Sequence, residues 1–204
     1  MRATPRPAGE RRRQIVEAAI LEFATRGYRD VGTAEIARRV GVSEPAVYRH
    51  FASKLALYLA AIDHSTSVID EAWQALEARA PTPLDALRAI GLWSYEQLRT
   101  DPPHFTLRAR ALVETREPAA SERLRSHFAE SSRTIERLYR AAQAAGQVPA
   151  AVDVRARAWV FIALGALLDR TQLLGMATDL GADAMRDVIA SVMPELAGRP
   201  RTAR

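Results

Sequence analysis

Side chains suited to binding a polyanion lie together between residues 44 and 54. Tyr48, Arg49 and His50 are consecutive, and Lys54, the only lysine in the chain, follows four residues later. Hydroxyl, imidazole and ammonium groups donate hydrogen bonds to phosphate oxygens, which position a protein on a nucleic-acid backbone. A guanidinium can also pair with O6 and N7 of guanine. These residues are therefore candidate DNA contacts, although Tyr48 as a packed helix aromatic and Arg49 as a solvated surface charge are open alternatives.

The distribution of charge along the chain supports this interpretation. The 204 residues carry a formal net charge of +5. Residues 1–54 hold 11 basic and 6 acidic side chains, whereas residues 55–204 hold 18 of each. A basic first quarter joined to a balanced remainder indicates that one end meets a polyanion and the other has a different task.

The composition also excludes several classes of site. There are no cysteines, which removes disulfides, thiolate zinc sites and thiol nucleophiles. The longest apolar run, 158–168, is short of the about 20 residues that span a bilayer, so no membrane partner is expected. The basic start lacks the apolar stretch of a secretion signal, and we expect a cytoplasmic protein. No cofactor is expected: the four histidines are scattered, and His127 with Glu130 offers too few ligands for a metal.

The elements that position the candidate contacts are predicted to be helices. Proline and glycine divide the chain into helical lengths and no segment alternates with period two, so the expected fold class is all-α. Nine helices are expected over 9–26, 33–40, 43–51, 53–80, 84–99, 103–115, 119–145, 153–174 and 182–196. The eighth is apolar nearly all round and must be covered on every side, most simply by a second copy of the chain.

Residues 33–51, TAEIARRVGVSEPAVYRHF, predict a helix-turn-helix. Thr33 is the expected N-cap of the first short helix and Gly41 closes it. Ser43 is the expected N-cap of the second, with Pro45 in its first turn. In such a motif the second helix enters the major groove, and a helix N-terminus can take a phosphate.

The stretch FATRGYRDVGTAEIARRVGVSEPAVYRHFASKLALY resembles the N-terminal DNA-binding domain of TetR/AcrR-family transcriptional regulators. The shared pattern includes the Gly-aromatic after the first helix, Gly-Val-Ser at the turn, Tyr-x-His-Phe and a following Ser-Lys. It covers about residues 10–65, and the rest of the chain is similar only in general form. Two positions depart from the pattern: Ala34 stands where a second threonine is common, and Leu55 stands where an acidic residue often follows the lysine.

The resemblance implies a role for each candidate DNA contact. Phosphate contacts fall to Thr33, Ser43, Tyr48, His50 and Lys54. Base-edge reading falls to Glu44, Pro45, Ala46 and Arg49, although Glu44 could equally be an acid favoured by the helix dipole. Further contacts to flanking phosphates or the minor groove fall to an arm holding Arg11, Arg12 and Arg13, expected to be disordered without DNA.

The resemblance also implies a domain organisation. We expect a basic disordered arm over 1–9, a DNA-binding domain over 10–55 with its motif at about 32–51, a helical regulatory and dimerisation domain over 56–197, and a basic tail over 198–204. The ligand pocket is expected at Trp73, Trp93, Gln97, Phe105, Arg108, Leu112, Phe128 and Tyr139. Ordinary core packing is an equal alternative for each, and Arg108 could pair with Glu114 or Glu117. The dimer interface is expected at Leu164, Gly165, Leu168, Met185, Ile189 and Val192.

The predicted function is that of a homodimeric, ligand-responsive transcriptional repressor that binds a pseudo-palindromic DNA operator and is released by a small-molecule effector. An activator or global regulator of the same fold is the alternative. An enzyme or a scaffold that does not bind DNA is a remote one, because no phosphate loop or nucleophile motif is found in the sequence.

Overall fold

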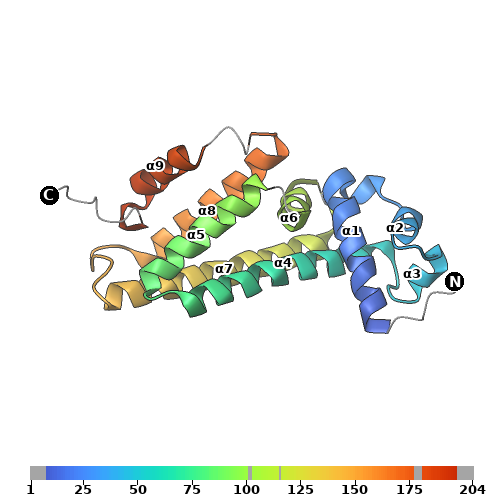
Figure 1. The fold of residues 1–204 in the computed structure, drawn as a ribbon, viewed down its shortest axis with the longest axis horizontal. Helices are drawn as coiled ribbons and strands as arrows, with labels where there is room; N and C mark the ends of the chain where they lie inside the picture. The colour runs from blue at the N-terminus through green and yellow to red at the C-terminus, as the bar shows by residue number, and fades with distance from the viewer. Residues whose placement is uncertain (1–7, 101–102, 115, 177–180, 197–204) are drawn as a thin grey trace. The chain divides into compact units, whose positions relative to one another are not determined.

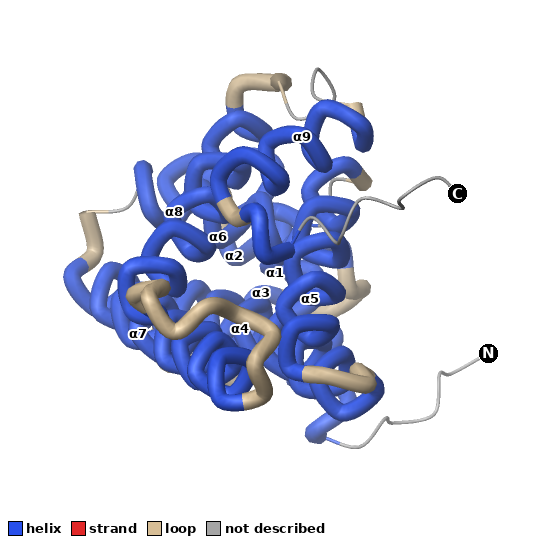
Figure 2. The backbone as a smooth tube through the Cα atoms, turned by 90° about the vertical axis from the view of Figure 1, so that its left-hand side faces the viewer, coloured by secondary structure: helices blue, strands red, loops and turns tan. Residues whose placement is uncertain are grey.

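The computed structural model describes residues 8–100, 103–114, 116–176 and 181–196, which contain helices and no strand (Figures 1 and 2). The predicted all-α fold class is therefore confirmed. The predicted disordered arm and basic tail lie almost entirely outside these residues. The helices are α1 Ala8–Asp30, α2 Thr33–Arg39, α3 Glu44–Tyr48, α4 Lys54–Arg79, α5 Pro83–Arg99, α6 Pro103–Glu114, α7 Pro118–Ala144, α8 Val154–Leu173, α9 Ala182–Val192 and the short 3-10 helix η1 Pro194–Leu196.

Glycine, proline and capping residues place the helix ends close to the predicted positions. The helical run of α1 continues to Asp30, but Gly27 within it has φ 81° and ψ 167°, so the regular helix breaks at that glycine. Ser53 caps α4 as predicted, because its Oγ accepts from the Ala56 N–H at 3.0 Å. None of the helices in the described parts of the chain is long and apolar enough to cross a membrane.

One predicted cap is wrong. Gly32, not Thr33, is the N-cap of α2, and the Glu35 carboxylate returns to accept from the Gly32 N–H at 2.9 Å. Thr33 is the first helical residue, and its side chain is buried with its hydroxyl turned toward α3. The sequence pattern of a threonine before a helical run could not distinguish these positions, because glycine also serves as an N-cap.

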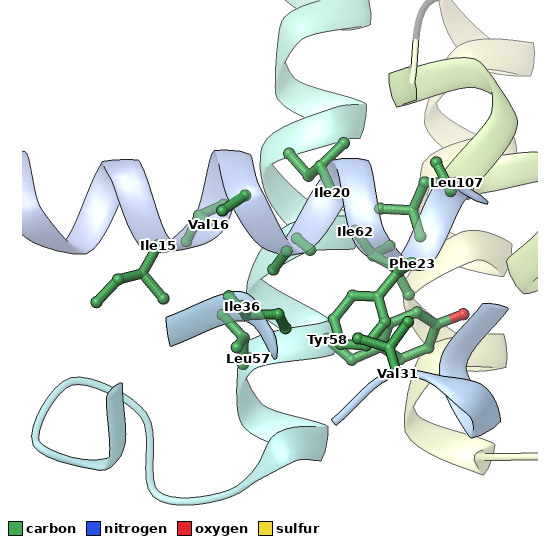
Figure 3. Close-up of a cluster of buried hydrophobic side chains, with 14 of the residues drawn as sticks. Ile15, Val16, Ile20, Phe23, Val31, Ile36, Leu57, Tyr58, Ile62 and Leu107 are labelled. Carbon is green, nitrogen blue, oxygen red and sulfur yellow. The ribbon is translucent and has the colours of Figure 1, made fainter. Parts of the chain in front are cut away.

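The chain forms two compact units, each described separately. The first holds the described residues up to 69 and from 103 to 126, and the second holds 70–100 and 127–196. The first unit is larger than the predicted DNA-binding domain, because α6 packs along α1. Its core joins buried side chains of α1, α2, α4 and α6 (Figure 3). Those labelled are Ile15, Val16, Ile20, Phe23, Val31, Ile36, Leu57, Tyr58, Ile62 and Leu107.

The portions of α4 and α7 that belong to the second unit, which begin at Asp70 and His127, run parallel to each other. The carboxylate of Glu77 accepts two hydrogen bonds from the Arg137 guanidinium, each at 2.7 Å. Seven residues earlier on α4, the Asp70 carboxylate lies 3.6 Å from Nδ1 of His127 on α7. Helices α5 and α8 pack beside each other with Leu87, Ile90, Leu98, Ala158 and Phe161 buried.

Candidate nucleic-acid interface

The turn between α2 and α3 has the geometry of a helix-turn-helix. Gly41 adopts φ 68°, its N–H donates to the Arg38 carbonyl at 3.2 Å, and the Val42 N–H donates to the Ala37 carbonyl at 3.0 Å. This is the Schellman pattern that ends a helix with a left-handed residue, where glycine alone avoids the Cβ penalty. Ser43 then takes the N-cap position of α3 with Pro45 at its second residue, as predicted, although its side chain makes no capping bond.

A hydrogen-bonded cluster joins the two helices of the motif. The Thr33 hydroxyl on α2 donates to the Glu44 carboxylate and lies 3.0 Å from the Tyr48 hydroxyl on α3. Thr33 is only 5% exposed. Glu44 was expected to read bases, and Thr33 and Tyr48 to bind phosphates. The structure brings these three side chains together within the protein. This cluster links α2 to α3.

The outer face of α3 carries the accessible candidates. Ser43, Pro45 and Arg49 are exposed, and Tyr48 is 46% exposed. Ala46 is different, because its side chain is 8% exposed and packs inward with Val47. The expectation that Ala46 meets a thymine methyl group therefore finds little support in the structure. The remaining exposed groups are the Arg49 guanidinium, the Ser43 and Tyr48 hydroxyls and the Pro45 ring.

Lys54 lies at the start of α4 against the end of α1. Its Nζ donates to the Arg29 carbonyl at 3.3 Å and stands 4.7 Å above the Tyr28 ring. Tyr28 in turn packs on Tyr58, with ring centroids 4.5 Å apart. Burial lowers the pKa of the Lys54 ammonium. The lysine thus also contacts the residues of α1 that follow Gly27, which sequence reasoning missed although the glycine-aromatic pair lies next to them.

The three predicted arm arginines belong to the first turns of α1, so the expectation of a disordered arm is wrong for them. The Arg11 guanidinium donates to the Gln14 side chain at 3.1 Å and to the Val40 carbonyl at 3.4 Å. The Arg12 guanidinium stacks 4.8 Å from the Phe51 ring centroid. Arg13 pairs with Glu17 at 3.7 Å on the exposed face. The Glu10 carboxylate in the first turn interacts favourably with the dipole of this helix.

Two ion pairs fix α1 against α2. The Arg26 guanidinium donates to the Glu35 carboxylate at 2.7 Å, and Nε of Arg39 donates to Glu22 at 2.7 Å. The hydrogen bond from Arg26, followed by the Gly32 N–H, lowers the pKa of Glu35 to about 2. These ion pairs link α1 to α2, the first helix of the helix-turn-helix motif.

Comparisons with known proteins agree with this geometry. Residues 15–61 match the family model described as bacterial regulatory proteins, tetR family. ArpR, a transcriptional regulator of Pseudomonas putida, is 30% identical over 194 residues that cover 90% of each chain. The chain belongs to the TetR family. Because this family consists of regulatory proteins, the prediction that the chain is not an enzyme is confirmed.

Other TetR-family matches add detail about individual relatives. The activator FasR of Mycolicibacterium smegmatis is 48% identical over 71 residues, which are 34% of this chain and 32% of that protein. Three such curated regulators match over only 32 to 49% of their own length. A regulator from Saccharomonospora viridis solved in complex with choline has the same fold, with a TM-score of 0.78 and 24% identity, covering 91% of this chain and 96% of that one.

The predicted ligand residues of this TetR-family chain are divided between the two units. Phe105, Arg108 and Leu112 are in the first unit, where the Arg108 guanidinium stacks 4.9 Å from the Phe105 ring and Leu112 is exposed. Trp73 and Tyr139 are buried in the second unit, and Trp93, Gln97 and Phe128 are half-buried there. Burial raises the pKa of the Tyr139 hydroxyl, and Glu195 adds to the effect.

Most of the predicted dimer residues face inward in the second unit. Leu164, Gly165 and Leu168 of α8 line a cavity between α5, α8 and α9, as do Met185 and Ile189 of α9. The apolar side chains that α8 turns outward are Trp159 and Leu167, 63% and 57% exposed. The sequence could not assign these faces, because α8 is apolar on all sides.

Proposed function

We propose that this chain is a homodimeric, ligand-responsive transcriptional repressor that reads a pseudo-palindromic operator in the cytoplasm. The observation that carries the proposal is the α2–α3 motif with Arg49, Tyr48 and Ser43 exposed on the outer face of α3. In this proposal Arg49 and Pro45 meet base edges, while Tyr48, Ser43, His50 and Lys54 meet phosphates. Arg11, Arg12 and Arg13 follow the flanking backbone from the start of α1.

The outward apolar face of α8 supports a homodimer. Trp159, Ala163 and Leu167 are exposed at four-residue spacing, so they form one stripe along the helix. A stripe of this kind on a second copy gives an isologous contact with two-fold symmetry. Two-fold symmetry suits an operator whose half-sites lie about 34–36 Å, or a multiple of it, apart. We therefore move the proposed interface from the predicted inner residues to this outer stripe, and we keep Val192 of α9, which is also exposed, as a candidate.

A small molecule bound in the second unit would act by changing the distance between the two helix-turn-helix motifs of the dimer. Such a ligand shifts the equilibrium only as far as its affinities for the DNA-bound and free spacings differ. Choline is bound by the regulator from Saccharomonospora viridis, which supports an effector site in proteins of this fold.

Activation of transcription is the second candidate. FasR is named as an activator and is 48% identical over its matching segment. A helix-turn-helix that binds an operator serves a repressor and an activator equally well. The position of the operator relative to the promoter therefore decides between repression and activation, and the helix-turn-helix motif does not.

A reporter fused to the upstream region of the chain's own gene tests the proposal. Expression of the chain is expected to lower the reporter signal, and a molecule that stabilises the purified protein is expected to restore it. A ligand at 100 times its dissociation constant stabilises by about 2.7 kcal/mol, which thermal-shift screening detects. A raised signal would establish the activator instead, and an unchanged signal would contradict both candidates.

A further inference from the structure

The second unit contains a cavity that the residues predicted for ligand binding do not line. It has a volume of about 650 Å³ and lies between α5, α8 and α9. Small-molecule sites in proteins are typically about 300–1,000 Å³. Its walls are mostly apolar. They include Leu87, Leu98, Phe161, Leu168, Met185 and Met193.

A buried hydroxyl stands in the wall of this cavity. Oγ of Ser94, on α5, is buried and has no hydrogen-bond partner among the described residues. Leaving a polar group buried and unpaired costs about 1–3 kcal/mol, so such groups usually have a partner. Within an apolar cavity, a ligand that carries one hydrogen-bonding group would satisfy it.

The two arginines that line the cavity already have protein partners. Arg88 pairs with Asp85 at 3.0 Å and donates to the Glu195 carbonyl at 3.3 Å. Arg186 pairs with Asp183 on its own helix. The third charged residue at the cavity, Asp187 of α9, is exposed to solvent. The cavity therefore offers no uncommitted arginine to an anionic ligand, and the buried Ser94 hydroxyl is itself uncharged, which favours a neutral ligand.

We propose that this cavity binds a neutral, predominantly apolar small molecule whose single polar group hydrogen-bonds to Ser94. The proposal rests on the proposed function and deepens it, because it names a site and a ligand chemistry for the small molecule bound in the second unit. The site is distinct from the predicted pocket residues, none of which lines it.

Helix α9 is the wall of the cavity that a ligand would affect most. Its C-terminal end is anchored: Arg157 donates to the Val192 carbonyl at 2.6 Å and pairs with Glu195 at 3.3 Å, and the Tyr139 hydroxyl lies 3.3 Å from Sδ of Met193. Its earlier residues, including Met185 and Ile189, border the cavity. A bound ligand fills the space beneath this part of α9 and stabilises it.

Binding of N-phenyl-1-naphthylamine to the full chain, followed by fluorescence without DNA, tests the site. This probe is neutral and apolar, with one N–H that can donate to Ser94 Oγ. The filling variant is Gly165→Leu, because a Cβ at Gly165 meets nothing within 4 Å and leucine favours a helix over glycine. The control is Gly9→Leu, a helical glycine with equally open surroundings in the first unit.

Gly165→Leu is expected to weaken probe binding by about tenfold or more, since its side chain occupies the same volume. Ser94→Ala is expected to weaken it by about three- to tenfold through the lost hydrogen bond. Gly9→Leu should bind as the unchanged protein does. The probe should also slow amide hydrogen exchange in residues 182–190.

Equal probe binding by Gly165→Leu and the unchanged protein would overturn the proposal. Failure of the unchanged protein to bind the probe would also overturn the proposal. So would a dimer in which side chains of a second copy of the chain fill the cavity. None of these results bears on operator binding, which the reporter assay measures separately. Loss of operator binding would likewise leave this site intact.

Discussion

At the residue scale, Arg49 and Lys54 have different surroundings and should have different effects on DNA binding. Arg49 is exposed at the C-cap of α3, whereas Lys54 lies against Tyr28 and the Arg29 carbonyl. Arg49→Ala should relax preference at one position per half-site, by about 1–3 kcal/mol of discrimination. Lys54→Ala should weaken binding to all sequences about equally. Competition anisotropy with single-base operator variants measures both, and altered sequence preference in Lys54→Ala would refute this division.

The Arg26–Glu35 ion pair should make the first unit sensitive to acid. The pKa of Glu35 falls from 4.5 to about 2 on folding, chiefly through the Arg26 hydrogen bond. A lowered pKa contributes stability that is present above pH 4.5 and is lost as the pH falls toward 2. Glu35→Gln should therefore show a smaller drop in stability between pH 6 and pH 3.

Urea unfolding at the two pH values measures that difference. Glu130→Gln is the control, because Glu130 is an exposed carboxylate 3.8 Å from Arg133. An unchanged drop in the Glu35→Gln protein would show that other carboxylates dominate the acid response.

At the element scale, the turn between α2 and α3 depends on Gly41. A non-glycine residue at its φ of 68° costs about 1–2 kcal/mol, so Gly41→Ala should destabilise the protein by about that much. Gly165→Ala is the matched control, since that helical glycine has open space and alanine should stabilise it by about 0.5–1 kcal/mol. Chemical denaturation measures both changes. Equal effects from the two variants would contradict the assigned role of Gly41.

The positions of the helices could be predicted from the sequence, because residues adjacent in the chain determine where a helix begins and ends. Gly41, Ser53 and Pro83 mark ends that depend on backbone geometry and capping alone. Contacts between helices were harder to predict. Thr33 has the right type for an N-cap, but the approach of α3 turns its hydroxyl to Glu44 and Tyr48. Such pairings depend on how helices pack, which a single sequence does not state.

At the scale of the whole molecule, the outer stripe of α8 should hold two copies together. Trp159 and Leu167 are exposed large apolar residues on that helix. Replacing both with glutamate should convert a dimer into monomers, because charge is costly in a buried interface. Light scattering coupled to size exclusion measures the mass. Val113→Glu, an exposed apolar position in the first unit, is the control. A double variant that stays dimeric would place the interface elsewhere.

The cavity between α5, α8 and α9 lay beyond sequence reasoning for the same physical reason. Helix α8 is apolar all round, so its pattern marks no face as inner or outer. Leu164 and Leu168 were predicted to meet a second copy, and nothing in the sequence indicated that they line a cavity in the single chain. The predicted family and the function class it implies rested on a local motif, which a sequence specifies much better than a tertiary face.

The central claim is sequence-specific DNA binding through α3, and one titration tests it most directly. The full chain is titrated against its own upstream region and against a scrambled duplex of the same composition, across a series from 50 to 200 mM salt. The upstream region should bind about 10³-fold tighter or more, with affinity falling steeply as salt rises through counterion release. Equal affinity for the two duplexes at every salt concentration would contradict the account.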